Sequence, residues 1–183
     1  MAKQDTINTA IRIPKDIYEK IEFEAESNNS NISSVINAAL RKHVTWDQFV
    51  SDIGFVFMQK PFLRTIFEKI SEGDLVMAAR TTCHSGMRDA VVFIHGKIAV
   101  DAIVDVIKLW LSASDMPLRV VKKTDMLEFR IQHNLGKKGS LYFSTLLITL
   151  FEEIEIVPAK NPLLKDHAAI VTFKIKKTKP KKK

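Results

Sequence analysis

The chain has 183 residues, of which 46% are hydrophobic, and this is enough to bury the core of one ordinary domain, with or without a small extra module. No run approaches the roughly 18 uninterrupted apolar residues that span a bilayer, the first residues lack the apolar segment of a secretory signal, and a single cysteine, Cys83, excludes an intrachain disulfide framework. These features exclude an integral membrane protein and a disulfide-stapled domain, and we expect a soluble cytoplasmic protein. The formal net charge is +7.

The first predicted element is a strand over residues 5–14 whose two sides differ sharply. Its apolar side consists of Ile7, Thr9, Ile11 and Ile13, and its polar side consists of Thr6, Asn8, Ala10 and Arg12. This period of two is typical of a strand with one buried side. Pro14 follows at once and turns the backbone away from a hairpin, so nothing nearby in the chain covers the isoleucines.

Two amphipathic helices are predicted next. The first covers residues 14–25, because Pro14 is tolerated in a first turn and Asp16 and Glu19 suit the positive end of the helix dipole. The polar cluster 27–31 predicts a turn and a cap for a second helix, which starts near Ile32 and extends toward or past Trp46. Their apolar sides are Ile17, Tyr18, Ile21 and Ala25 in the first helix and Ile32, Val35, Ile36, Ala39, Leu40 and Val44 in the second.

A second copy of the chain would solve the problem of the uncovered strand. Burying each isoleucine contributes roughly 1.5 to 3 kcal/mol, and an unpaired strand leaves backbone groups without partners. Two such strands pairing antiparallel across a two-fold axis satisfy the backbone, and the helices of both subunits then cover the apolar side. We therefore expect a homodimer whose formation is part of folding.

Strand, helix, turn and helix at this spacing resemble the ribbon-helix-helix family, the MetJ and Arc class of DNA-binding proteins. The resemblance covers about residues 3–43 and rests on "AIRIPKDIYEKI" followed by "SNISSVINAALRKHV". It implies a DNA-binding and dimerisation module over residues 1–45, in which an intertwined dimer inserts a two-stranded ribbon into the major groove of double-stranded DNA.

The family motif implies which residues would contact DNA. The polar side of the ribbon would present Asn8, Ala10 and Arg12 to base edges; arginine pairs with guanine and asparagine with adenine, each good pair giving on the order of 1 to 3 kcal/mol of discrimination. Phosphate contacts would come from Lys3, Thr6, Ser30, Asn31, Ile32 and Ser33. The alternative for the second helix is that Ser30 or Asn31 only caps it.

The charge of this module leaves an alternative open. Residues 1–50 carry six basic and seven acidic side chains, which is unusual for a DNA-binding module. Most of the acidic residues belong to the outer side of the first helix, whereas Lys3, Arg12 and Lys15 lie near the ribbon. The alternative is that the module serves only as a dimerisation clasp.

Residues 46–175 are expected to form a C-terminal α/β domain for oligomerisation or sensing. The predicted elements are a linker helix, helices over 61–71, 72–86, 98–114 and 139–154, two strands within 118–134 about a turn at 123–125, and a final strand over 167–175. Residues 90–94 fit either a strand or a buried helix. With a strand at residues 90–94, the order of the elements is that of a ferredoxin-like sandwich with extra N-terminal helices. The expected fold class is therefore α+β.

Nothing in this domain predicts catalysis or a metal site. Cys83, His84, His95, His133 and His167 lack the paired spacing of a metal motif, and His133 is best explained as a structural histidine. There is no GxSxG, dinucleotide or HExxH motif, so we expect no enzyme and no cofactor. The architecture is similar to that of the nickel-responsive ribbon-helix-helix repressors, whose second domain senses metal and forms tetramers, but no ligand motif matches. A tetramer and an unidentified small-molecule effector are further expectations that the sequence leaves open.

The chain ends in a lysine-rich segment, residues 176–183, that is expected to be disordered. Seven lysines between residues 174 and 183 equal the net charge, so the rest of the chain is neutral overall. Lys179, Lys181, Lys182 and Lys183 would attract DNA regardless of sequence; the alternative is a solubilising terminus. The leading interpretation is a nucleoid-associated, sequence-specific transcriptional regulator, with an antitoxin-like interaction protein and an architectural nucleoid protein as alternatives.

Overall fold

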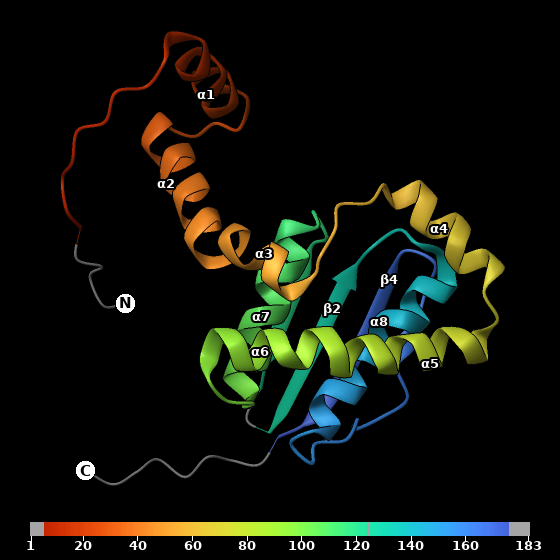
Figure 1. Ribbon diagram of the computed structural model, residues 1–183. Coiled ribbons are helices and arrows are strands. Elements are labelled where there is room, and N and C mark those ends of the chain that lie inside the picture. Colours follow the sequence, from red (N-terminus) through yellow and green to blue (C-terminus); the bar gives the residue numbers. More distant parts are fainter. Residues whose placement is uncertain (1–5, 124, 176–183) are drawn as a thin grey trace, which may run out of the picture. The chain divides into compact units, whose positions relative to one another are not determined.

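The computed structural model describes residues 6–123 and 125–175 (Figure 1). The chain divides between Thr45 and Trp46 into two compact units, an N-terminal and a C-terminal unit, each treated separately below. The described residues combine helices with one antiparallel sheet, as expected of an α+β protein. None of the described helices has both the length and the apolar character that a membrane span requires.

The N-terminal unit consists of an extended segment and two helices. Residues 6–14, called the extended segment below, form no helix or strand, so the predicted strand is not present in the single chain, and no strand of the described residues pairs with them. Helices α1 (Lys15–Ser27) and α2 (Ile32–Lys42) follow as predicted. The turn between them is fixed by a hydrogen bond from the Ser30 amide to the Ala25 carbonyl, 2.8 Å, and by Asn29, whose φ is 48°.

The C-terminal unit is built on a four-stranded sheet. Its strands β1 (Leu118–Lys122), β2 (Met126–Gln132), β3 (Leu163–Leu164) and β4 (Ala168–Lys174) are antiparallel in the order β1-β2-β4-β3. The predicted strand pair about residues 123–125 and the predicted final strand are therefore confirmed. Leu127, Phe129 and Ile131 of β2 are buried, and the intervening residues point to the other side of the sheet.

Helices cover one face of this sheet (Figure 1). The buried faces of α7 (Val100–Ala113) and α8 (Gly136–Glu152) form the core with the inner side of the sheet, where Phe129, Phe151 and Phe173 are fully buried. The predicted helices over 98–114 and 139–154 are confirmed, although α8 begins three residues earlier. The remaining helical segments are η1 (His43–Asp47), α3 (Gln48–Ile53), α4 (Lys60–Lys69), α5 (Glu72–Thr82), η2 (Cys83–Met87) and α6 (Arg88–His95).

The ferredoxin-like order is wrong at its first strand. Residues 90–94 lie in α6, which ends at His95 and has Gly96, with φ 68°, as its C-cap. Ala90 and Val91 are fully buried but Phe93 is 57% exposed, so the segment packs by one helical side and not by alternate residues. A run of five apolar residues fits the period of a strand and the period of a helix equally well. Packing against the neighbouring helix therefore determines which of the two forms.

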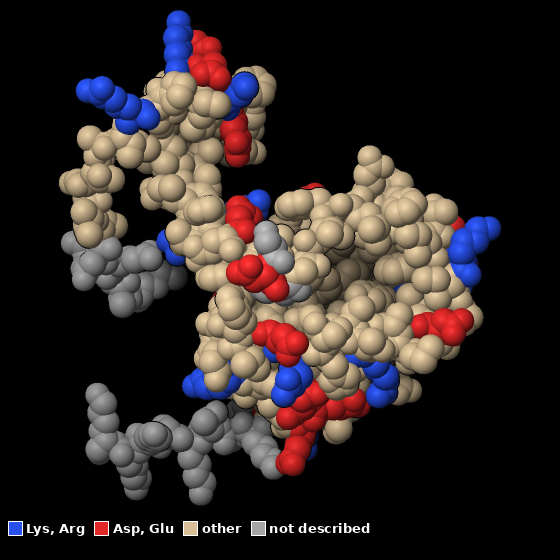
Figure 2. Space-filling view, in the orientation of Figure 1, with Lys and Arg blue, Asp and Glu red and all other residues tan. Residues whose placement is uncertain are grey.

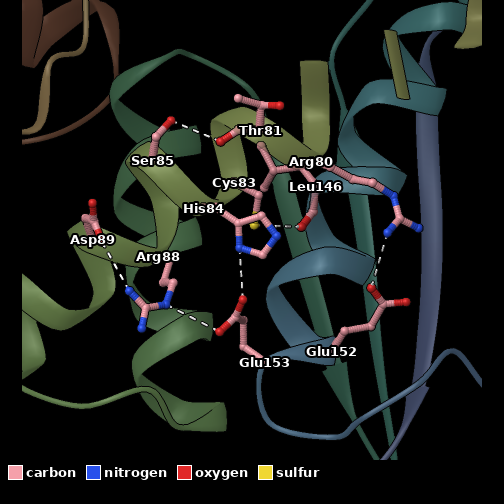
Figure 3. Close-up of polar contacts among 10 residues, drawn as sticks. All are labelled: Arg80, Thr81, Cys83, His84, Ser85, Arg88, Asp89, Leu146, Glu152 and Glu153. Carbon is pink, nitrogen blue, oxygen red and sulfur yellow. Dashed lines mark hydrogen bonds and ion pairs between the residues drawn. The ribbon is translucent and has the colours of Figure 1, made fainter. Parts of the chain in front are cut away.

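The π-helical turn η2 joins α5 to α6 and is anchored to the end of α8 (Figure 3). Glu153 accepts contacts from His84 Nδ1 at 2.9 Å and from Arg88 Nε at 3.3 Å, and Glu152 lies 4.0 Å from Arg80. The two glutamates thus form the polar end of α8, as the sequence indicates. Cys83, in the same turn, is fully buried.

Candidate nucleic-acid interface

The extended segment exposes both of its sides in the single chain. Ile7 is 93% and Ile11 60% exposed, and Ile13 is half-buried. On the polar side Thr6, Asn8, Ala10 and Arg12 are all exposed. Figure 2 shows no acidic side chain on this segment, and Arg12 forms no ion pair with any described residue. The predicted base-reading residues are therefore all accessible, and Ile7 and Ile11 are left uncovered.

The two helices provide almost no core for this unit. Of the described side chains in residues 6–45, Ala25 is the one that is buried, at 3% exposure. Ile21, Ile32, Val35 and Ile36 are half-buried between the helices. The apolar side chains that remain exposed are Ile17, Tyr18, Phe23, Leu40 and Val44. A unit with this little buried apolar surface does not offset the entropy of ordering its own chain.

Phe23 is a feature that the periodicity does not reveal. It is 72% exposed, on the side of α1 away from the half-buried residues, and it lies between Glu22 and Glu24 in the sequence. A single aromatic residue flanked by two charges produces no helical repeat, so the predicted apolar side of the first helix does not include it. Its exposure adds to the apolar surface that the single chain leaves uncovered.

Four of the predicted phosphate contacts, Ser30, Asn31, Ile32 and Ser33, lie at the start of α2, whereas Thr6 lies in the extended segment. Asn31 is the N-cap, and its Oδ1 accepts the Ser34 amide hydrogen at 2.8 Å. Ile32 and Ser33 supply the first two amides of the helix, which have no acceptor within it. The expected capping role thus belongs to Asn31 and not to Ser30, whose amide closes the preceding turn. Lys3, Lys179, Lys181, Lys182 and Lys183 lie outside the described residues.

The C-terminal unit contains a buried pair of side chains, His133 and Ser140, but the direction of the hydrogen bond between them does not suit nucleophilic catalysis. His133 Nδ1 accepts the Leu135 amide hydrogen at 2.9 Å, so the neutral ring carries its proton on Nε2 and donates it to Ser140 Oγ at 2.9 Å. Ser140 in turn donates to the carbonyl of Lys165 or Ala168. The histidine does not act as a base toward the serine, and burial lowers its pKa to about 4.

The other potential metal ligands and nucleophiles of this unit are dispersed. The described residues contain no group of three or more His, Cys, Asp or Glu side chains that could hold a metal ion. Burial, with the nearby Glu153 and Glu152, raises the pKa of the Cys83 thiol to about 12. The thiol donates to the Leu146 carbonyl at 3.6 Å and stays protonated at neutral pH, so it is a poor nucleophile.

Comparison with models of protein families, with curated proteins and with solved structures found no match.

Proposed function

We propose that the protein is a sequence-specific DNA-binding transcriptional regulator that inserts a two-stranded ribbon into the major groove as a homodimer. The observation that carries this proposal is the uncovered apolar side of the extended segment, with Ile7 and Ile11 exposed next to a helical pair that buries only Ala25 among its described side chains. A second copy of the same segment is the simplest cover, since it also pairs the free backbone groups.

Pairing of two segments would orient their polar sides together. Side chains alternate along a strand, so covering Ile7 and Ile11 directs Asn8, Ala10 and Arg12 outward from both copies. The major groove, about 12 Å wide, admits such a ribbon. Arg12 supports base reading because it has no acidic partner among the described residues, and its guanidinium can make a bidentate contact with guanine.

The start of α2 supports the positioning of this ribbon on the DNA backbone. The free amides of Ile32 and Ser33 and the positive end of the helix dipole favour a phosphate. Such contacts carry no sequence information. Specificity in this proposal therefore rests on Asn8 and Arg12, and Ala10 contributes at most contact with a thymine methyl group.

The proposal is tested by selection of binding sites from a random pool of duplex DNA, using the full chain and its Arg12→Ala variant. We expect the parent protein to enrich one sequence, and Arg12→Ala to remain dimeric but to lose about 1 to 3 kcal/mol of discrimination at the position that Arg12 reads. Identical enrichment by both proteins would reject the reading residues, and absence of any enrichment by the parent would reject sequence-specific binding.

A variant lacking residues 179–183 provides the matched control. It removes positive charge without touching the ribbon, so we expect weaker binding to every sequence and a salt dependence that is flatter by roughly one unit for each phosphate that the missing lysines would have neutralised. The selected sequence should not change. If the parent instead binds all duplexes equally and this variant loses most of the affinity, the protein is an architectural nucleoid protein and not a regulator.

A further inference from the structure

The sheet of the C-terminal unit has a hollow on the face opposite the helices. It lies where β1 begins, β2 ends and β4 begins, and its volume is about 460 Å³. Sites for small molecules usually measure about 300–1,000 Å³. All lining residues belong to the C-terminal unit, so this hollow is independent of the N-terminal unit and of the DNA-binding proposal.

Two arginines lie side by side on the face of the sheet that carries this hollow. Arg119 of β1 and Arg130 of β2 are directly opposite in the strand register, an arrangement in which like charges destabilise a sheet. Arg130 is compensated by Glu128, whose Oε1 lies 2.6 Å from both Nε and Nη2. No acidic side chain of the described residues pairs with Arg119. The guanidinium of Arg119 therefore has no counter-charge from any described residue on this face of the sheet.

The remaining walls complete an amphipathic site. Gln132 and His167 add polar groups, and none of the lining residues is acidic. Ile170 is the register partner of Arg130, and Ala168 is that of Gln132, so aliphatic surface lies beside the charged groups. The hollow thus combines donors for an anion with a small apolar surface.

The same sheet does not offer a platform for single-stranded nucleic acid. Proteins that bind single strands stack bases on exposed aromatic rings. The aromatic residues of the described strands, Phe129 and Phe173, are fully buried on the inner face with α8. A ligand of the open face is therefore held by charge and aliphatic contact and not by base stacking.

We propose that this hollow binds a small organic anion, with its carboxylate or phosphate group on Arg119 and Arg130 and its aliphatic part over Ala168 and Ile170. The planar guanidinium of Arg119 matches both anionic groups, because it can donate two parallel hydrogen bonds to them, whereas Nε and Nη2 of Arg130 already contact Glu128. Gln132 supplies a further donor to the same group. Binding supplies the counter-charge that Arg119 lacks among the described residues, which gives the ligand part of its affinity.

The test is NMR of the ¹⁵N-labelled full chain, observing the arginine side-chain Nε–Hε signals at constant ionic strength. Butyrate and butyl phosphate are titrated separately, with chloride as the reference salt. We expect saturable shifts of the Arg119 and Arg130 signals, and the tighter of the two probes identifies the preferred anionic group. We expect Arg119→Gln to weaken binding at least about tenfold, because it removes one charge-assisted bidentate contact.

Lys122→Gln is the matched control, because Lys122 is an exposed cation of the same strand that pairs with Asp101 at 3.7 Å and does not line the hollow. It should leave binding unchanged. Arg119→Gln removes a like-charge neighbour, so its thermal unfolding midpoint should not fall. The inference is overturned if neither probe gives a saturable shift, if Lys122→Gln weakens binding as much as Arg119→Gln, or if Arg119→Gln weakens DNA binding while the probes do not bind.

Discussion

His133 shows how one buried side chain can make the stability of the C-terminal unit depend on pH. The ring is 1% exposed, stacks on Phe143 with 5.3 Å between centroids, and uses both nitrogens in hydrogen bonds to Leu135 and Ser140. A second proton would have to go on Nδ1, and it would break the bond from the Leu135 amide. Burial and this geometry therefore both favour the neutral ring.

Because its pKa is lowered to about 4 from an ordinary value of 6.5, His133 binds a proton more readily in the unfolded chain. Its contribution is complete above pH 6.5 and is lost as pH falls toward 4, by about 3 kcal/mol in total. We expect urea unfolding at pH 7 and at pH 4.5 to show this loss in the parent protein, and His133→Asn, which keeps an acceptor for the Leu135 amide, to lose about 2 to 3 kcal/mol less between the two pH values. Equal losses in both proteins would contradict the assignment.

At the scale of elements, the first turn of α8 depends on a close approach to the loop before it. A Cβ added to Gly139 would lie 2.5 Å from Leu135 Cβ and 3.1 Å from His133 Nδ1. Gly139 thereby allows the helix to begin directly against the buried histidine. Gly73 occupies the first turn of α5, where an added Cβ would meet nothing closer than Ser71 Oγ at 4.0 Å.

The two glycines should respond in opposite directions to the same substitution. Gly139→Ala forces Leu135 and His133 to move, and we expect it to lower the free energy of unfolding by about 1 to 3 kcal/mol. Gly73→Ala meets open space and gains helix propensity, so we expect no loss and a gain of up to about 1 kcal/mol. Chemical unfolding of both variants measures the difference, and a Gly139→Ala protein as stable as Gly73→Ala would disprove the close packing.

For the whole molecule, the two units differ in how much of their stability lies within one chain. The C-terminal unit has a contiguous buried core that includes Phe129, Phe151 and Phe173, whereas the N-terminal unit buries only Ala25 among its described side chains. Because the C-terminal unit has its own core and the N-terminal unit depends on a partner subunit, we expect two unfolding transitions. The first should depend on protein concentration, as expected when folding and association are linked.

Ile11→Asp tests this dependence directly. A charge on the apolar side of the ribbon removes roughly 1.5 to 3 kcal/mol of burial from each of two subunits, and we expect the dimer dissociation constant to rise at least about 100-fold. Sedimentation velocity should show a dimeric parent and a monomeric variant, with the transition of the C-terminal unit unchanged. Ala10→Asp, one residue away on the opposite side, is the control and should remain dimeric. A monomeric parent, or a dimeric Ile11→Asp protein, would refute the proposed ribbon.

The sequence by itself determined the elements whose signals are local. The helices α1 and α2, the strand pair β1 and β2 and the helices α7 and α8 all follow from periods of two or of 3.6 residues and from turn residues. The alternation before Pro14 predicts that Asn8, Ala10 and Arg12 share one side of a strand, and both this strand and its DNA contacts stay predictions.

The tertiary structure decided whatever depends on partners distant in the chain. Residues 90–94 became helix because their neighbours bury one helical side, and five apolar residues carry no signal that separates the two periods. The register of β1 and β2 placed Arg119 against Arg130, and the fold enclosed His133 between Ser140 and Phe143. Charge, burial and pKa at these positions are set by the neighbours that folding supplies, and a local pattern of residue types does not contain that information.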